Sequence, residues 1–179
     1  MGKILKIREV GDPCLYSKSE EVKKIDDSIL EIIEDMKETL NFTDGFGIAA
    51  PQIGINKRIV IIQVDSTKCT YDGAEDVPTT VMINPALRPI SNETDVQYEG
   101  CLSVPSIRGK VERYKDIEVT YLDENGNKIQ KTLHGFTARD VQHECDHLDG
   151  VLFVDKVPEK GFATIDTIKR FDLKNKEEN

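Results

Sequence analysis

The sequence predicts an α+β fold in which mixed or antiparallel strands pack around a central metal-binding helix, with an amphipathic helix near the N-terminus. Three observations predict this class: an apolar stripe of helical period over residues 25–40, β-rich runs between residues 58 and 133, and a His-Glu-x-x-His motif in a second helical segment. The 179 residues contain no internal repeat, low-complexity tract or linker. We therefore expect a single domain over 1–179, of which about 166–179 form a partly ordered tail.

Composition narrows the classes of partner and compartment. The net charge of -9 and the isoelectric point near 4.9 argue against a nucleic-acid groove or an anionic membrane surface. No apolar run is long enough for a signal peptide or a membrane span, so we expect a cytoplasmic protein with reduced thiols. The cysteines have irregular spacing, do not suggest a disulfide framework, and offer one metal ligand among Cys14, Cys69, Cys101 and Cys145.

The first element is expected to be an amphipathic helix over residues 25–40. Apolar residues recur at 25, 29, 32, 33, 36 and 40, which places them on one side of a helix. Asp26, Asp27 and Ser28 stand at the start of the stripe and are available as the N-cap.

Loops and strands are expected in the middle of the chain. A glycine-rich loop occupies 44–52, and the apolar, β-branched run 58–64 predicts a buried strand. The polar, turn-rich segment 65–78 predicts a surface loop, and 80–83 predicts another strand.

A hairpin is expected before the second helix. Ile117, Val119 and Tyr121 alternate with polar residues, Asn125-Gly126 is a turn signal, and 128–133 returns as the partner strand.

The second helix is expected to begin at about Phe136 and to stop at Gly150, since glycine is favoured just beyond a helix end. Its core-facing side is predicted to carry Val141, Cys145 and Leu148, with Cys145 as a small core residue that points away from the metal. The opposite side carries Phe136, Arg139, Asp140, His143 and His147.

The motif on this helix points to a metal site. Two imidazoles four residues apart lie roughly 40° apart around a helix axis, so His143 and His147 can both reach one ion at about 2.0–2.1 Å. Glu144 is turned about 100° from His143, where it can hold the proton of a metal-bound water without ligating. Two surface histidines placed at this spacing by chance are disfavoured, because the chain has only three histidines.

A catalytic site of this kind needs a third protein ligand, and spacing leaves three candidates open. His134 lies upstream on a strand, and Asp140 precedes His143 by three residues on the same side of the helix. Cys101 lies among small and turn-forming residues over 99–105. Cys101 is modestly favoured because a thiolate is the strongest ligand of the three.

Three segments occur together in a recognisable order: Gly-Phe-Gly-Ile-Ala-Ala-Pro-Gln at 45–52, Glu-Gly-Cys-Leu-Ser at 99–103 and Gln-His-Glu-Cys-Asp-His-Leu at 142–148. They resemble the three motifs of the peptide deformylases, and the resemblance covers most of the chain up to about Phe153. It implies a deformylase-like hydrolase that removes the N-formyl group from the formyl-methionine of nascent polypeptides.

The resemblance implies that Cys101, His143 and His147 are the metal ligands, which favours Cys101 as the third one. It implies one divalent metal ion, Fe²⁺ in the cell, although one cysteine and two histidines would by themselves suggest Zn²⁺. Ni²⁺ or Co²⁺ can also occupy such a site in purified protein. Glu99 is expected to orient a ligand or to pair with Arg113.

The resemblance also assigns the catalytic groups. A metal-bound water is expected to attack the formyl carbon, with Glu144 as the general base that passes the proton to the leaving amine. The Gln52 side-chain amide and the Leu102 backbone N–H are expected to donate to the developing oxyanion.

The peptide substrate is expected to add a strand between Phe46 and Gly100, with Gly45 and Gly47 beside it. Arg108 is expected to contact the substrate backbone further along.

The pocket for the first side chain is expected to involve Phe136, Arg139 and Asp140. In similar proteins a small or apolar residue more often stands at Asp140, and Phe46 is bulkier than the usual aliphatic residue. A carboxylate near an apolar side chain costs on the order of several kcal/mol, so Asp140 should pair with Arg139 or face solvent at the pocket rim. We expect the enzyme to tolerate smaller or more polar first residues.

The expected partners are N-formylmethionyl nascent peptides, with transient ribosome contact, and neither DNA nor a membrane. Four basic and four acidic residues balance over 166–179, so the end of the chain shows no evident attraction to RNA. The segment 161–165 can add a short strand.

Two other functions stay open at this point. A His-Glu-x-x-His peptidase would take its third ligand downstream of the helix, where Asp155, Glu159 and Asp166 are the nearby candidates. A structural-metal module would have four protein ligands and no role for Glu144.

Overall fold

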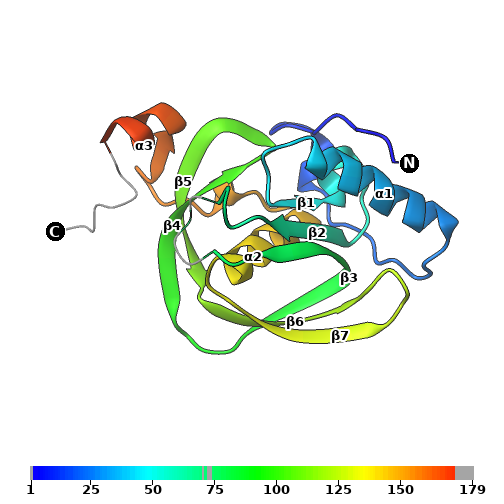
Figure 1. The fold of residues 1–179 in the computed structure, drawn as a ribbon. Coiled ribbons are helices and arrows are strands. Elements are labelled where there is room, and N and C mark those ends of the chain that lie inside the picture. Colours follow the sequence, from blue (N-terminus) through cyan, green and yellow to red (C-terminus); the bar gives the residue numbers. More distant parts are fainter. Residues whose placement is uncertain (1, 70, 72–73, 172–179) are drawn as a thin grey trace.

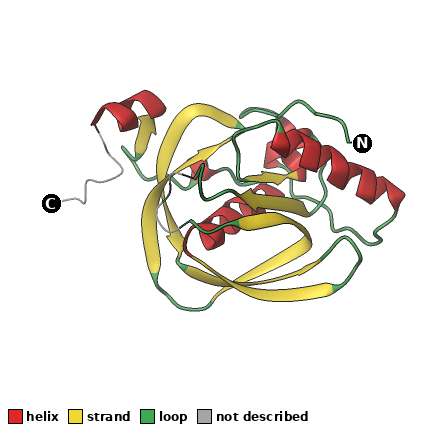
Figure 2. Cartoon of the chain, in the orientation of Figure 1, coloured by secondary structure: helices red, strands yellow, loops and turns green. Residues whose placement is uncertain are grey.

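The computed structural model describes residues 2–69, 71 and 74–171, and two sheets surround a central helix (Figures 1 and 2). The helices are α1 (Asp27–Asn41), α2 (Gly135–Leu148) and α3 (Ile165–Phe171). The strands are β1 (Gly47–Ala49), β2 (Ile59–Val64), β3 (Val77–Pro89), β4 (Thr94–Cys101), β5 (Val104–Tyr114), β6 (Asp116–Leu122), β7 (Lys128–His134) and β8 (Phe162–Thr164). The α+β class is confirmed.

The two sheets are antiparallel. The larger sheet has the strand order β1-β2-β3-β6-β7, and the smaller one has the order β4-β5-β8. Helix α2 contacts strands of both sheets, and in Figure 1 β6 and β7 lie below it while β4 and β5 lie to its left. The helix that carries the His-Glu-x-x-His motif is therefore held between the sheets.

Helix α1 occupies the segment where the apolar stripe predicted a helix. The Asp26 carboxylate accepts hydrogen bonds from the backbone N–H groups of Ser28 and Ile29, so it caps the first turn. Ile33 and Met36 are fully buried, and they pack in an apolar cluster with residues of β1 and β2. This packing fixes α1 against the outer side of the larger sheet.

The predicted strands are present, but two long strands, β4 and β5, were not predicted from the sequence. The strand expected at 80–83 is the middle of β3, which begins at Val77 inside the expected surface loop. The expected hairpin is β6 and β7, within a residue of its predicted bounds. Strands β4 and β5 were not predicted, because their buried positions include charged residues such as Glu99 and Arg113 rather than an apolar run.

Helix α2 buries one side in the core as predicted. Val141, Cys145 and Leu148 pack with residues of β2, β3 and β6 in one apolar cluster. The interpretation of Cys145 as a core residue is therefore confirmed. The helix ends at Leu148, and Gly150 follows with a φ of 73°, a left-handed conformation that glycine adopts without strain.

The first part of the segment expected to be a partly ordered tail is helical. The short strand suggested for 161–165 is β8, which pairs with β5, and it leads directly into helix α3. The tail residues 172–179 lie outside the described part of the chain. No helix among the described residues is long and apolar enough to cross a membrane.

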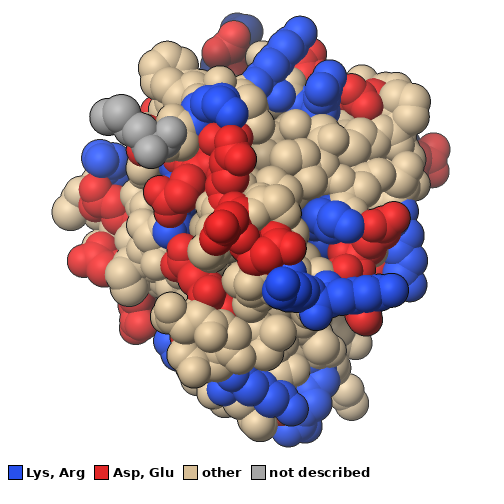
Figure 3. All heavy atoms as spheres, turned by 90° about the vertical axis from the view of Figure 1, so that its right-hand side faces the viewer, with Lys and Arg blue, Asp and Glu red and all other residues tan. Residues whose placement is uncertain are grey.

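The charge distribution follows the composition. Figure 3 shows the face on the α1 side, where acidic side chains form a band and lysines and arginines are dispersed around it. This arrangement agrees with the net charge of -9.

Candidate metal centre and active site

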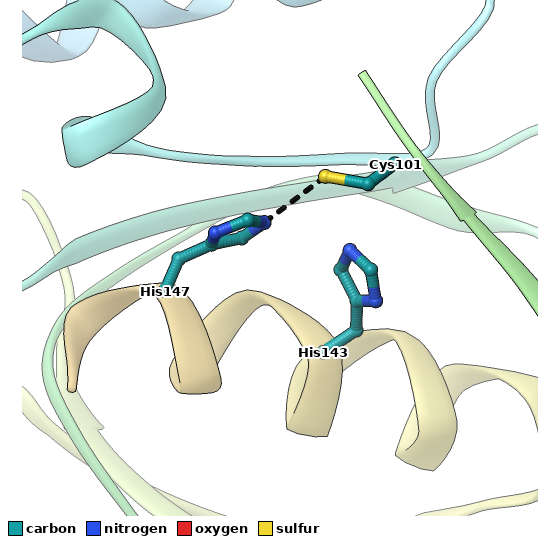
Figure 4. Close-up of side chains that lie close together, drawn as sticks. All are labelled: Cys101, His143 and His147. Atoms are coloured by element: carbon teal, nitrogen blue, oxygen red, sulfur yellow. Dashed lines mark hydrogen bonds between the residues drawn. The ribbon is translucent and has the colours of Figure 1, made fainter. Parts of the chain in front are cut away.

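The structure brings together one cysteine and two histidines from distant parts of the chain. Cys101 ends β4, whereas His143 and His147 project toward it from α2 (Figure 4). One ligand atom from each of the three residues lies within 4.8 Å of the others, and Cys101 Sγ is 3.2 Å from His147 Nε2. His134 is absent from this group, because it is exposed and its Nδ1 lies 2.6 Å from the Asp116 carboxylate.

The Cys101 sulfur has the surroundings of a thiolate. The backbone N–H of Ser103 and the side-chain amide of Gln52 each donate to Sγ at 3.4 Å. Burial by itself raises the pKa of the Cys101 thiol, but the imidazoles of His147 and His143 outweigh it and lower the pKa well below its usual value. One thiolate and two imidazoles form a donor set that suits Fe²⁺, Zn²⁺, Ni²⁺ or Co²⁺.

A buried carboxylate orients His143. The Glu99 carboxylate lies 2.9 Å from His143 Nδ1, which leaves Nε2 on the side of Cys101 and His147. Arg113 donates two hydrogen bonds of 2.9 Å to the same carboxylate. The sequence predicted that Glu99 either orients a ligand or pairs with Arg113, and the structure shows contacts with both His143 and Arg113.

The Glu99 carboxylate stays ionised in this setting. Burial raises its pKa, but the hydrogen bonds from Arg113 and His143 outweigh burial and hold the pKa well below its usual range. Arg113 also contacts Asp146, which in turn binds Lys156. The His143 imidazole is thus supported, through Glu99 and Arg113, by a chain of ion pairs that continues to Asp146 and Lys156.

Glu144 lies beside the ligand group with one oxygen unused. The residue is buried, and its Oε2 atom has no hydrogen-bond partner among the described residues. Burial raises the pKa of Glu144 well above its usual value, while His143 lowers it and Asp140 adds to the increase. A carboxyl that is buried without a protein partner is suited to hold the proton of a bound molecule.

Gly47 makes room for this carboxyl. A Cβ atom at Gly47 would lie 2.7 Å from both Cγ and Oε1 of Glu144. Real Cβ contacts are almost never that short, so a larger residue at Gly47 would displace the Glu144 side chain.

Gln52 is fixed with its amide nitrogen toward the ligand group. The residue lies in a short 3₁₀ turn, Ala50–Ile53, and it is almost fully buried. Its Oε1 accepts from the Ala49 N–H at 2.8 Å, and its Nε2 donates to Ser103 Oγ at 3.2 Å. Leu102 lies directly after Cys101 and lines the same cavity as Gln52.

A cavity of about 200 Å³ opens beside these groups. Its wall contains every residue that was predicted to bind substrate, namely Gly45, Phe46, Gly47, Gly100, Arg108, Phe136, Arg139 and Asp140. Gln52, Leu102, Cys101, His143 and Glu144 line it as well, whereas His147 lies behind them against Cys101.

Two of the lining glycines permit close packing. A Cβ at Gly100 would lie 2.2 Å from Cζ of Arg108, so the guanidinium rests directly on this backbone. A Cβ at Gly45 would lie 3.0 Å from Cδ1 of Leu102. The motif glycines therefore bring the cavity walls together.

Two wall residues, Asp44 and Tyr71, were not predicted from the sequence. The ring of Tyr71 stacks on Phe136 with 4.6 Å between centroids and an interplanar angle of 22°, and Phe46 meets Phe136 edge-on at 5.5 Å. The Tyr71 hydroxyl donates to the Tyr98 carbonyl at 2.8 Å. The available signal was a tyrosine within the otherwise polar segment 65–78.

The first alternative for Asp140, a pair with Arg139, is wrong, whereas the residue is half-buried and lines the cavity. The Arg139 guanidinium donates instead to Glu99 at 2.6 Å and to Asp95 at 2.5 Å. Asp140 Oδ2 is buried and has no hydrogen-bond partner among the described residues. Neighbouring residues on a helix point about 100° apart, so Arg139 reaches β4 while Asp140 enters the cavity.

Comparison with known proteins identifies the family of this chain. The family model described as polypeptide deformylase matches residues 4–162. The chain belongs to the peptide deformylase family. Peptide deformylase 1 of Nitrosomonas europaea is 40% identical over 164 residues, which cover 90% of this chain and 93% of that protein.

Solved structures of deformylases share the fold. The enzyme of Thermotoga maritima is 39% identical, with a TM-score of 0.78, over 87% of this chain and 98% of that one. A ligand-bound deformylase of Acinetobacter baumannii is 36% identical, with a TM-score of 0.82, over 87% of this chain and 100% of that one. The chain is accordingly an enzyme of the peptide deformylase type.

Proposed function

We propose that this protein is a metal-dependent hydrolase that removes the N-formyl group from the formyl-methionine of nascent polypeptides. The observation that carries the proposal is the buried Glu144 carboxyl, whose Oε2 atom has no partner among residues 2–69, 71 and 74–171. It lies beside the Cys101, His143 and His147 group at the wall of an aromatic-lined cavity. The family membership of the chain supports the same reaction.

Cys101, His143 and His147 are the proposed ligands of a single divalent ion. The chemistry of the three donors fits Fe²⁺, which we propose for the cell, and also Zn²⁺, Ni²⁺ or Co²⁺ in purified protein. When bound, the ion supplies a Lewis acid that polarises the formyl group and lowers the pKa of a water molecule.

Glu144 is the proposed general base and general acid. Its Oε2 atom is free to accept the proton of the attacking water and then to pass it to the amine that leaves. The absence of a side chain at Gly47 keeps this carboxyl in place.

Gln52 and Leu102 are the proposed donors to the formyl oxygen as it gains negative charge. The Ala49 N–H fixes the Gln52 amide through Oε1, so its Nε2 donor is oriented before substrate arrives. Nε2 contacts Ser103 and Cys101, which shows that it faces the ligand group rather than solvent.

The peptide is proposed to lie as an extended strand between Phe46 and Gly100. Phe46 directly precedes β1 and Gly100 lies near the end of β4, and both line the cavity together with Gly45 and Gly47. Arg108, which rests on Gly100, is proposed to contact the backbone of the peptide. A relative from Acinetobacter baumannii was solved with Met-Ala-Ser bound, a peptide that begins with methionine.

The proposed setting follows from the substrate. Formylated nascent chains emerge from ribosomes, so we propose the cytoplasm as the compartment, transient ribosome contact, and one catalytic domain over 1–179. The proposal includes neither a DNA partner nor a membrane partner.

The test is an assay of formate release from a formyl-Met tripeptide, with metal analysis of protein purified without oxygen. The unaltered protein should carry a single divalent ion and release formate while the peptide bonds stay intact. Cys101→Asp should lower metal content and formate release together. Cleavage inside the peptide would indicate a peptidase instead, and a retained metal without any hydrolysis would indicate a structural site.

A further inference from the structure

One carboxyl of the cavity wall keeps a buried, unpartnered oxygen that the proposed chemistry does not use. Asp140 Oδ2 is buried at the cavity wall without a hydrogen-bond partner among the described residues. We propose that Asp140 is a specificity-determining residue, which accepts a hydrogen bond from an N–H or O–H group on the first side chain of the formyl peptide. This inference rests on the proposed deformylase function.

The cationic and hydroxyl groups near Asp140 are committed to other partners. The Arg139 guanidinium is directed to Glu99, Asp95 and the Val111 carbonyl. The Tyr71 hydroxyl donates to the Tyr98 carbonyl. Arg108, on the same wall, donates to the Ile107 carbonyl. None of these neighbours satisfies Asp140 Oδ2, so the proposal assigns its partner to a donor on the ligand that occupies the cavity.

An unpartnered carboxyl at this place is costly for the empty protein. Burial raises the pKa of Asp140 to about 7, while His143 lowers it and Glu99 raises it further. In either protonation state the group loses solvation that an apolar ligand does not replace. A ligand that brings a donor recovers part of this loss, and so binds better than an apolar ligand of the same shape.

The rest of the wall defines the shape of that ligand. Phe46, Tyr71 and Phe136 form an aromatic trio on the cavity wall, which favours an apolar stem. The chemistry that fits both features is a side chain with an aliphatic part and a terminal amide or hydroxyl. Glutamine, asparagine and threonine have this chemistry, whereas methionine has no hydrogen-bond donor.

The experiment compares first residues that share a shape and differ in the donor. Formyl tripeptides that begin with Gln or Met, with Asn or Leu, and with Thr or Val form three such pairs of decreasing length. The ratio of kcat/KM for the polar to the apolar member is measured with the metal-loaded enzyme and with Asp140→Val. We expect Asp140→Val to lower this ratio by roughly 10- to 100-fold in at least one pair, the pair whose length matches the reach to Oδ2.

Thr137→Val is the matched control on the same helix. Thr137 lies one turn before Asp140 and is not part of the cavity wall, so this change should leave the three ratios unaltered. Ratios that are the same in the unaltered enzyme and in Asp140→Val for all three pairs would overturn the inference. Failure to deformylate formyl-Met peptides at all would instead contradict the proposed function.

If Asp140→Val does not fold, Asp140→Asn offers a second route. The amide keeps the shape and adds a donor, so it should raise the rate for acceptor-bearing first residues such as formyl-methionine sulfoxide relative to formyl-Met. An unchanged preference in a folded Asp140→Asn enzyme would also overturn the inference.

Discussion

The two sides of helix α2 differ in the kind of residue that they bury. On the core side, Val141, Cys145 and Leu148 are buried in an apolar cluster and carry no charge. On the cavity side, Asp140 and Glu144 each keep a buried oxygen without a partner among the described residues. Burial of the apolar side stabilises the fold, whereas the polar groups of the other side can form hydrogen bonds with a bound molecule.

The contrast extends to how polar groups are satisfied. Glu99 lines the cavity and is bound by Arg113, Arg139 and His143, so its carboxylate fixes the orientation of the His143 imidazole. Glu144 is equally buried, yet its Oε2 atom has no partner in the part of the chain that the structure describes. Two glutamates within one site therefore differ in function because one is surrounded by cations and the other faces the cavity.

The largest effect is expected from Glu144→Gln. The change keeps shape and removes the proton acceptor, so turnover on formyl-Met peptides should fall by roughly 10²-fold or more. Metal content and thermal stability should stay close to those of the unaltered protein, because the ligands remain and a buried acid is removed. Glu159→Gln, the same change at an exposed site, is the control. Turnover above about a tenth of the unaltered value would contradict a general-base role.

A somewhat smaller effect is expected from Gln52→Leu. Loss of the fixed donor should lower kcat on the order of 10²-fold with little change in metal content. Gln130→Leu, on exposed β7, should leave kcat unchanged. If Gln52→Leu changes KM alone, Gln52 binds the peptide uniformly and does not stabilise the oxyanion.

A substitution on the core side of α2 should lower the stability of the protein rather than its turnover. Leu148 is fully buried, so Leu148→Ala should lower the free energy of unfolding by about 2–5 kcal/mol. Denaturant unfolding measures this loss, and turnover per metal-loaded molecule should stay close to that of the unaltered enzyme. A fall in turnover as large as that of Gln52→Leu, without a loss of stability, would show that the two sides of α2 are not separate in function.

The sequence by itself determined the elements that carry a local period. The stripe over 25–40 predicted α1, the core side of α2 followed from its helical spacing, and the alternation at 117–133 predicted β6 and β7. The same spacing predicted that His143 and His147 lie close enough together to bind one ion, and their ring nitrogens do lie close together. These inferences succeed because each depends on residues within one or two helical turns or strand repeats.

The tertiary structure alone decided what depends on distant partners. Strands β4 and β5 could not be predicted from an apolar pattern, because they bury the ion pair of Glu99 and Arg113 at positions where apolar residues would be expected. Spacing left three candidates for the third ligand open, and only the fold places Cys101 beside His147, 46 residues away in the sequence. Arg139 does not pair with Asp140 because β4 places Asp95 within reach of its guanidinium. A buried charged side chain pairs with the opposite charge that is nearest in space, which need not be its neighbour in the sequence.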